Sequence, residues 1–227
     1  MNIAIIGAGL YGCHLAISLK TSGYDVDLHE MRDDIFTGAS TQNSYRIHKG
    51  YHYPRFGKTR EMCKEDEAEF VRHYSHLISP EKDNAKIFCV ADDERTLIDY
   101  ITMKLIMRGS GLPFEEVSLE ELERMGFRNI EGGFKVHEAI FLVDKAKNWF
   151  RRTLIDKGVH LKLDCPMDKI EFMDESRITI AECAYDFVIN CTYNQAIQHT
   201  STRYEHYFDP CLSLVMASKK IIREPGA

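Results

Sequence analysis

The sequence predicts an α/β fold, with a parallel sheet and flanking helices, into which a second, mixed α+β subdomain is inserted. Three observations lead to this prediction. A strand, a glycine-rich turn, a helix and a second strand follow one another within residues 1–30. The middle of the chain mixes helical patterns with short strands. From residue 159 onward short apolar strands return, which is typical of a chain that re-enters its first sheet.

The first thirty residues form the most regular pattern of the chain. An apolar strand over residues 3–6 leads into the glycine-rich turn and then into a helix over residues 10–22. Gly23 stands where a helix that ends in a left-handed residue needs a glycine. A second strand over residues 26–29 follows, and the acidic residue Glu30 closes it. This order is that of a βαβ unit, in which a helix joins two parallel strands.

The turn reads Gly7-x-Gly9-x-x-Gly12, and each glycine meets a different steric need. Gly7 permits the tight turn, Gly9 lets a pyrophosphate approach the backbone, and Gly12 lets the helix lie close to the strand. The helix N-terminus attracts phosphate, and Glu30 can accept hydrogen bonds from an adenosine ribose. The stretch therefore predicts a dinucleotide site. The alternative is a glycine-rich turn between strand and helix that binds nothing.

The later elements follow from periodicity and capping signals. A charged helix is expected over residues 59–78 and an amphipathic helix over 94–108. Ser118-Leu-Glu-Glu121 is a capping box for a short helix over 119–125, and Asp144 can cap a helix that ends at Gly158. The expected apolar face of the 94–108 helix is Leu97, Ile98, Ile101, Leu105 and Ile106. Strands are expected over residues 87–91, 132–136, 139–142, 159–163, 169–172, 177–181, 187–190 and 212–217.

Composition excludes several classes of function. A net charge of −6 gives no general reason to bind nucleic acid or an anionic membrane, and no apolar run is long enough to span a bilayer. The seven cysteines are scattered, odd in number and without a CxxC, which favours reduced thiols in the cytoplasm over a disulfide framework or a zinc site. The N-terminus lacks the pattern of a signal peptide. We expect a cytoplasmic chain that acts on a small molecule and binds no metal.

A second motif lies in the loop over residues 37–58. It reads Asn43-Ser44-x-x-Ile47-His48-x-Gly50-x-His52-Tyr53. Together with the first thirty residues it resembles the D-amino-acid-oxidase-like family of FAD-dependent oxidoreductases, and it is closest to members that oxidise small 2-hydroxy acids or amines. Four later segments are also similar to this family, namely residues 86–90, 132–144, 166–170 and 186–192.

The resemblance implies an FAD-binding Rossmann-type domain with an inserted substrate subdomain. The FAD-binding domain would take residues 1–85 and 139–211, and a partial substrate-binding subdomain would take residues 86–138 and 212–227. The cofactor would be FAD. The residues expected to contact FAD are Gly7, Gly9, Leu10, Tyr11, Gly12, Glu30, Met31, Arg32, Ser40, Thr41, Asn43, Ser44, Arg46, Ile47, His48, Met167, Cys191 and Thr192.

The reaction implied by the resemblance is hydride transfer to flavin N5 from the C–H next to an OH or NH of a small hydroxy acid, amino acid or amino sugar. His48 is expected to act as base or hydrogen-bond donor, and His52 and Tyr53 to line the substrate side. Arg46 or Arg55 could pair with a carboxylate. Each has a structural alternative, in which the rings pack the loop and the arginines are solvated.

The chain departs from the family in two respects. After Asn190 the family usually has a small-residue turn with glycine, whereas this chain has Cys191 and Thr192. Relatives are also commonly half as long again or more. The flavin site would then be partly open unless a second chain covers it.

Three alternatives remain for the function. The glycine motif and Glu30 suit an NAD-dependent dehydrogenase equally well, although the loop over residues 40–53 favours FAD. The chain could be a catalytically idle or truncated dinucleotide-binding protein. It could also hold flavin without net redox chemistry, as sugar-ring mutases do. Absorbance of bound flavin would distinguish an FAD-dependent enzyme from an NAD-dependent dehydrogenase.

Overall fold

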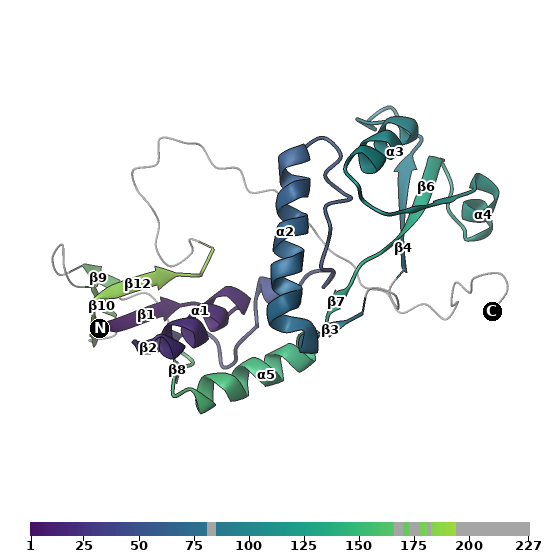
Figure 1. The fold of residues 1–227 in the computed structure, drawn as a ribbon. Coiled ribbons are helices and arrows are strands. Elements are labelled where there is room, and N and C mark those ends of the chain that lie inside the picture. Colours follow the sequence, from purple (N-terminus) through teal and green to yellow (C-terminus); the bar gives the residue numbers. More distant parts are fainter. Residues whose placement is uncertain (81–84, 166–169, 173–177, 181–182, 194–227) are drawn as a thin grey trace. The chain divides into compact units, whose positions relative to one another are not determined.

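The computed structural model describes residues 1–80, 85–165, 170–172, 178–180 and 183–193 of the 227-residue chain. The chain divides into two compact units. Unit 1 takes Met1–Ser44 and the described residues from Val143 onward, and unit 2 takes Tyr45–Leu142. Figure 1 shows the path of the chain through both.

Unit 1 contains a parallel sheet of four strands in the order β12-β1-β2-β8. Helix α1 contacts β1 and β2, helix α5 contacts β8, and the two helices contact each other, so both cover the same face (Figure 1). The parallel sheet confirms the predicted α/β fold. Its elements are β1 (Asn2–Ile6), α1 (Leu10–Thr21), β2 (Asp25–His29), the 3₁₀ turn η1 (Ala39–Thr41), α5 (Val143–Asp156), β8 (His160–Lys162) and β12 (Phe187–Asn190).

A small antiparallel sheet covers the other face. Its strands are β9 (Ile170–Phe172), β10 (Ile178–Ile180) and β11 (Cys183–Tyr185), in the order β11-β10-β9. Ile180 and Tyr185 join Ala4 and Ile6 in one buried cluster. Because successive strand residues point to opposite faces, Ile5 is left to pack towards α1. Strand β11 is not among the strands expected from the sequence.

A polar network ties strands β2, β8 and β11 together. Asp27 accepts hydrogen bonds from Tyr185 Oη and Lys162 Nζ, each over 2.6 Å, and pairs with His160 Nδ1 over 2.9 Å. Burial alone would raise the pKa of Asp27, but these hydrogen bonds outweigh it and lower that pKa. The carboxylate is therefore the charged centre of the network.

Unit 2 is built on an antiparallel sheet in the order β4-β6-β5. A two-stranded pair, β3 and β7, lies beside it in the same unit. The elements of this unit are α2 (Gly57–Tyr74), the 3₁₀ turn η2 (Ser75–Leu77), β3 (Ile78–Ser79), β4 (Ala85–Ala91), α3 (Tyr100–Gly109), β5 (Glu115–Val117), α4 (Leu119–Arg124), β6 (Ile130–His137) and β7 (Ile140–Phe141).

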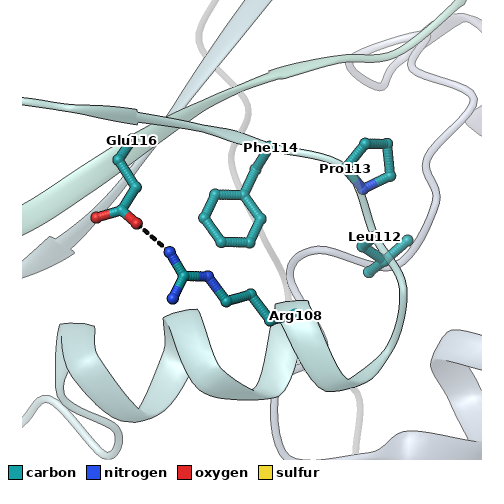
Figure 2. Close-up of a pocket in the computed structure, with 5 residues that line it drawn as sticks. All are labelled: Arg108, Leu112, Pro113, Phe114 and Glu116. Carbon is teal, nitrogen blue, oxygen red and sulfur yellow. Dashed lines mark hydrogen bonds and ion pairs between the residues drawn. The ribbon is translucent and has the colours of Figure 1, made fainter.

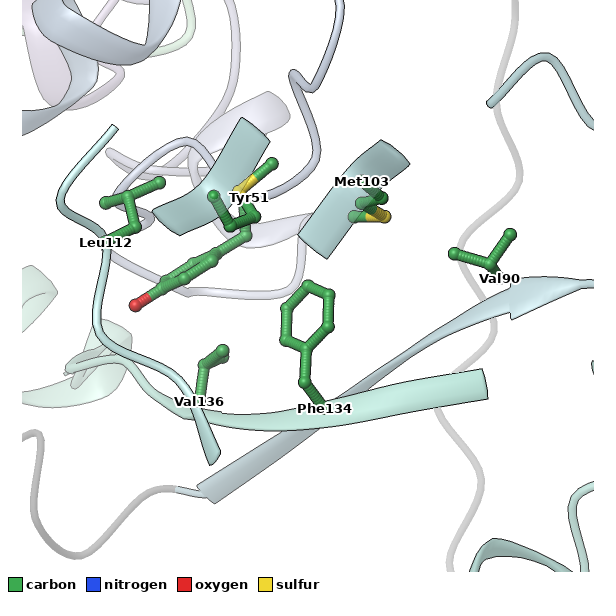
Figure 3. Close-up of a cluster of buried hydrophobic side chains, with 7 residues drawn as sticks. Tyr51, Val90, Met103, Leu112, Phe134 and Val136 are labelled. Carbon is green, nitrogen blue, oxygen red and sulfur yellow. The ribbon is translucent and has the colours of Figure 1, made fainter. Parts of the chain in front are cut away.

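The core of unit 2 is aromatic and sulfur-rich (Figure 3). The Phe134 ring is fully buried and stacks on Phe88, with ring centroids 5.8 Å apart. Tyr51 comes from the loop before α2, yet its ring is also fully buried in this core and its hydroxyl donates to the Pro113 carbonyl. Its burial anchors that loop to the sheet. The cluster consists of Tyr51, Val90, Met103, Met107, Leu112, Phe134 and Val136.

Helix α3 corrects the predicted 94–108 helix. It begins at Tyr100, because the Asp99 side chain accepts a hydrogen bond of 2.8 Å from the Thr102 amide and caps the helix there. The predicted apolar face is wrong in part: Leu97, Ile101 and Leu105 are 73%, 66% and 60% exposed, whereas Met103 and Met107 are buried.

Other boundaries follow the prediction more closely. The Ser118 hydroxyl accepts from the Glu121 amide over 3.2 Å, which confirms the start of α4. Helix α5 begins at Val143, so Asp144 lies in the first turn instead of capping it. Helix α2 ends at Tyr74, earlier than predicted, because a 3₁₀ turn follows. The predicted strand over residues 212–217 lies outside the described residues. Within the described residues, no helix combines the length and apolar character needed to cross a bilayer.

Candidate functional site

The glycine turn of unit 1 leaves no space for side chains at two positions. Gly7 has φ +96°, and a Cβ atom there would lie 2.7 Å from the Cys191 carbonyl oxygen. A Cβ atom on Gly12 would lie 1.9 Å from the Gly7 carbonyl oxygen. Both distances are impossible contacts with backbone, so the close approach of α1 to β1 depends on these two glycines.

The N-terminus of α1 is open to an anion. Gly9 is the N-cap residue and offers no side-chain cap, and the first turn holds no acidic residue. The Leu10 amide donates to Ser40 Oγ over 2.9 Å. A Cβ atom on Gly9 would lie 3.1 Å from this same oxygen. Ser40 therefore lies directly at the positive end of the helix, where phosphate is favoured.

Glu30 is held rigidly at the end of β2. Its carboxylate is nearly buried, and it accepts from the Ala8 amide over 2.8 Å and from the Arg32 amide over 3.2 Å. Its backbone also extends the strand ladder: its amide donates to the Lys162 carbonyl, and its carbonyl accepts from the Cys165 amide, both over 2.9 Å. The carboxylate is thus fixed next to the glycine turn.

The end of β12 completes this edge of the sheet. The Cys191 amide donates to the Ile6 carbonyl over 2.8 Å, and the Thr192 hydroxyl donates to Asn190 Oδ1 over 2.7 Å. Burial raises the pKa of the thiols of Cys13 and Cys191, which fits packing residues better than nucleophiles. The predicted residues that the structure brings together here are Gly7, Gly9, Leu10, Gly12, Glu30, Ser40, Cys191 and Thr192.

The remaining predicted residues of unit 1 are placed less distinctly. Tyr11 and Met31 are 80% and 60% exposed. The side chains of Arg32, Thr41 and Asn43 each donate to a carbonyl of their own loop. Ser44 is exposed as well, and Met167 lies outside the described residues.

In unit 2 the loop that carries the histidines is fixed at its start by backbone pairing. The Ile47 amide donates to the Ala139 carbonyl over 2.9 Å, and the backbones of Arg46 and Ile140 form an isolated antiparallel β-bridge. The Glu138 carboxylate accepts from the Lys49 amide over 3.2 Å. These contacts hold the residues on both sides of His48.

Arg60 of helix α2 fixes the far end of the same loop. Its Nη1 donates to the carbonyls of Tyr53 and Pro54, each over 2.7 Å, and its Nε donates to Ser110 Oγ over 2.8 Å. Gly50, with φ +95°, lies against its backbone: a Cβ atom there would be 3.1 Å from the Arg60 Cα atom. No sequence signal distinguishes this arginine from its solvated neighbours on a charged helix.

Between these anchors, three of the four predicted catalytic residues lie together. The ring centroids of His48 and His52 are 4.5 Å apart, and those of His52 and Tyr53 are 4.2 Å apart. Arg55 is different: it is exposed, and its guanidinium lies over the Phe56 ring. Burial lowers the pKa of His48, and partial burial together with His48 and Arg46 lowers the pKa of His52 to about 4. Both rings are therefore neutral near pH 7 and able to accept a proton.

Two charged residues of this cluster are not among the site residues expected from the sequence. Glu138 is fully buried, and its Oε2 lies 3.4 Å from Arg46 Nε. Lys86 lies in β4, and burial and Arg46 lower its pKa while Glu138 opposes the change. Glu138 stands between two short predicted strands, where a carboxylate is normally solvated, so only the tertiary structure shows its burial.

A pocket of about 530 Å³ in unit 2 contains none of the predicted residues (Figure 2). It is lined by Arg108, Leu112, Pro113, Phe114 and Glu116. Its two charged groups, Arg108 and Glu116, form an ion pair with each other, and Lys104 also pairs with Glu116. The two charged groups that line the pocket are thus already paired with each other, so we do not place the chemistry there. The described residues also contain no cluster of His, Cys, Asp and Glu that could hold a metal ion.

Comparison with known proteins identifies the family. Residues 2–204 match the model of the family described as FAD dependent oxidoreductase, or DAO. The chain belongs to this family. It is 31% identical over 225 residues to the FAD-dependent monooxygenase FPY4 of Fusarium mangiferae, covering 99% of this chain and 55% of the relative. It is 30% identical over 196 residues to the FAD-dependent monooxygenase kojA of Aspergillus flavus, covering 85% of this chain and 45% of the relative.

Solved structures of the DAO type share the fold. Glycine oxidase from Geobacillus kaustophilus superposes with a TM-score of 0.67 at 14% identity, covering 83% of this chain and 54% of that structure. L-proline dehydrogenase from P. horikoshii superposes with a TM-score of 0.61 at 18% identity, covering 86% and 53%. The chain thus spans about half the length of the relatives it matches.

Proposed function

We propose that this chain binds FAD through unit 1 and belongs to an enzyme that oxidises a small hydroxy acid, amino acid or amino sugar. The observation that carries the proposal is the geometry around the glycine turn. Three features lie at one edge of a parallel sheet: a helix N-terminus whose N-cap residue has no side chain, a turn without room for side chains at Gly7 and Gly12, and a fixed carboxylate at the next strand. Family membership favours FAD over NAD for this site.

The residues of unit 1 fit the adenosine and pyrophosphate parts of the cofactor. Gly9 and the first amides of α1 would face the pyrophosphate with Ser40 beside them, and Glu30 would accept hydrogen bonds from the ribose. When bound, FAD supplies the acceptor for a hydride from the substrate carbon. The protein supplies position and charge.

Visible absorption tests FAD binding, once the purified chain has been incubated with FAD and freed of unbound cofactor. A flavin band that acid precipitation of the protein releases into the supernatant indicates non-covalent FAD. Gly9→Asp is the sharpest variant, because aspartate at an N-cap stabilises a helix while its charge repels pyrophosphate. We expect this variant to fold and to lose FAD. A wild-type chain that stays colourless with FAD would refute the proposal and leave an NAD binder or an idle chain.

For the chemistry we propose that the histidine cluster of unit 2 handles the substrate. His48 would accept the proton from the substrate OH or NH, with His52 and Tyr53 next to it, and Arg46 or Arg55 would pair with a carboxylate. Anaerobic bleaching of the flavin by a panel of hydroxy acids, amino acids and amino sugars tests the substrate class. His48→Asn should slow bleaching far more than it weakens FAD binding.

A second candidate reaction is oxygen insertion, which the monooxygenase names of the two fungal relatives favour. Turnover under labelled dioxygen separates the two reactions, because only oxygen insertion puts the label into the product. Because the chain spans about half the length of these relatives, the activity proposed is that of the whole protein. A further chain or segment that covers the flavin is part of the same proposal, as is the assignment of residues 86–138 to a substrate subdomain.

A further inference from the structure

The buried carboxylate of Glu138 has no role in the function proposed so far. We propose that Glu138 is a positioning residue of the histidine cluster: it fixes the Arg46 guanidinium and balances the charge around His48 and His52. This inference rests on the proposed function, because the cluster matters for catalysis only if it meets the substrate.

The contacts of Glu138 are made at both carboxylate oxygens. Oε1 accepts from the Lys49 amide over 3.2 Å, and Oε2 lies 3.4 Å from Arg46 Nε. The side chain of Glu138 is 0% exposed and that of Arg46 is 23% exposed. A buried charge without a partner is strongly disfavoured, so each of the two groups depends on the other.

The orientation of Arg46 follows from these contacts. Glu138 lies on its Nε side, and the Phe88 ring lies against the guanidinium at 5.2 Å. Pairing through Nε leaves the two terminal nitrogens, which form the fork that binds a carboxylate, on the other side of the group. The contact is an ion pair without a hydrogen bond, so Glu138 acts on the position of that fork through its charge.

The charges around the histidines act in opposite directions. Arg46 opposes a proton on His48 and on His52, whereas Glu138 favours a proton on His48. The other titratable groups of the cluster are the rings of His52 and Tyr53, and Lys86 on β4. At His48 the two charges of the ion pair therefore act against each other, while burial remains the main cause of its lowered pKa.

Titration of the ring C–H signals of His48 and His52 by NMR tests this role and needs no cofactor. Glu138→Gln should shift the His48 midpoint to lower pH, and Arg46→Met should shift both midpoints to higher pH. The double variant should return towards the wild type. Glu94→Gln makes the same change at an exposed position and should shift neither midpoint.

Shifts in the same direction for the two single variants, or no shift for either, would overturn the inference. If either single variant does not fold, the double variant still decides the inference, because removing both charges leaves none unpaired and should restore the fold. If the double variant also fails to fold, the two side chains serve packing alone and the inference is wrong. In the flavin-loaded enzyme, Glu138→Gln should raise KM more than it lowers kcat. Failure to bind FAD would sink the proposed function but leave the titrations valid.

Discussion

The Glu30 carboxylate accepts a hydrogen bond of 2.8 Å from the Ala8 amide, although 22 positions separate the two residues in the chain. This contact joins the end of β2 to the turn after β1. Glu30 thus has a structural task before any ligand arrives, and its carboxylate needs no rearrangement to meet one.

Glu30→Gln should therefore destabilise the protein even without cofactor. The amide group of glutamine turns one acceptor into a donor, which then faces the amide of either Ala8 or Arg32. We expect a loss of about 1–3 kcal/mol in the free energy of unfolding, measured in urea without FAD. Glu65→Gln, at an exposed position on α2, is the matched control and should lose almost nothing. Equal stability of the two variants would contradict the structural role.

Gly12→Ala and Gly23→Ala should differ sharply. The added methyl group at Gly12 would lie 1.9 Å from a backbone oxygen, whereas at Gly23, with φ +90°, it would meet nothing within 4 Å. We expect Gly12→Ala to prevent folding, and Gly23→Ala to cost about 1–2 kcal/mol through backbone strain alone. Thermal unfolding followed by circular dichroism distinguishes them. A Gly12→Ala protein that melts like the wild type would show that the turn can open.

Stability should fall in mild acid because of His52. Its folded-state pKa, about 4, lies below the ordinary value of 6.5. Between these two pH values the unfolded chain binds a proton at His52 and the folded chain does not. The free energy of unfolding is therefore highest above pH 6.5 and falls as the pH drops from 6.5 towards about 4. Water reaches this side chain, so the loss is reduced by screening. Denaturant unfolding between these pH values should give a flatter pH dependence for His52→Asn than for the wild type. Parallel curves would rule out this contribution.

Arg60→Lys should loosen the loop that carries the histidines. The planar guanidinium of Arg60 donates to the carbonyls of Tyr53 and Pro54 and to the Ser110 hydroxyl at once. The ammonium group of lysine cannot reproduce this geometry. We expect faster hydrogen exchange at the Tyr53 and Phe56 amides, which bond within this loop. Arg72→Lys, at a side chain that is 72% exposed, is the control and should leave exchange unchanged. Similar exchange in both variants would show that the loop holds itself.

The two faces of α3 give the last prediction. Met107 is fully buried and Leu105 is 60% exposed. Met107→Ala should cost about 2–5 kcal/mol in the free energy of unfolding, and Leu105→Ala less than about 0.5 kcal/mol. Urea unfolding of both variants measures the difference. A larger loss for Leu105→Ala would restore the face expected from periodicity.

The contrast between the predicted and the observed features has a physical basis. The glycine turn and Glu30 were predictable because their roles are set within thirty residues, by backbone sterics and a helix terminus. The face of α3 was not, because Leu105 and Met107 are both apolar and only the packing of the sheet selects between them. Capping by Asp99 makes the same helix start later than expected. This start could have been predicted, because an aspartate directly before an apolar run is a common N-cap signal.

The histidine loop shows the same limit. His48, His52 and Tyr53 lie close in sequence, so their proximity could be predicted from the motif. Glu138 reaches them from a distant part of the chain and Arg60 from the helix that follows the loop, and neither stands in a pattern that distinguishes it from a solvated charge. The site is therefore readable from sequence where it is local, and it depends on the fold where it is assembled from distant parts.

The backbone bonds of Glu30 connect the ribose end of the proposed FAD site to an edge strand. Its amide and carbonyl bond to Lys162 and Cys165, so the main chain after β8 shares a rung with the residue proposed to hold the ribose. A ligand that restrains Glu30 would also make the opening of these two backbone hydrogen bonds less frequent. Hydrogen exchange at the Cys165 amide would then slow when the site is occupied, although this amide belongs to the neighbouring strand segment.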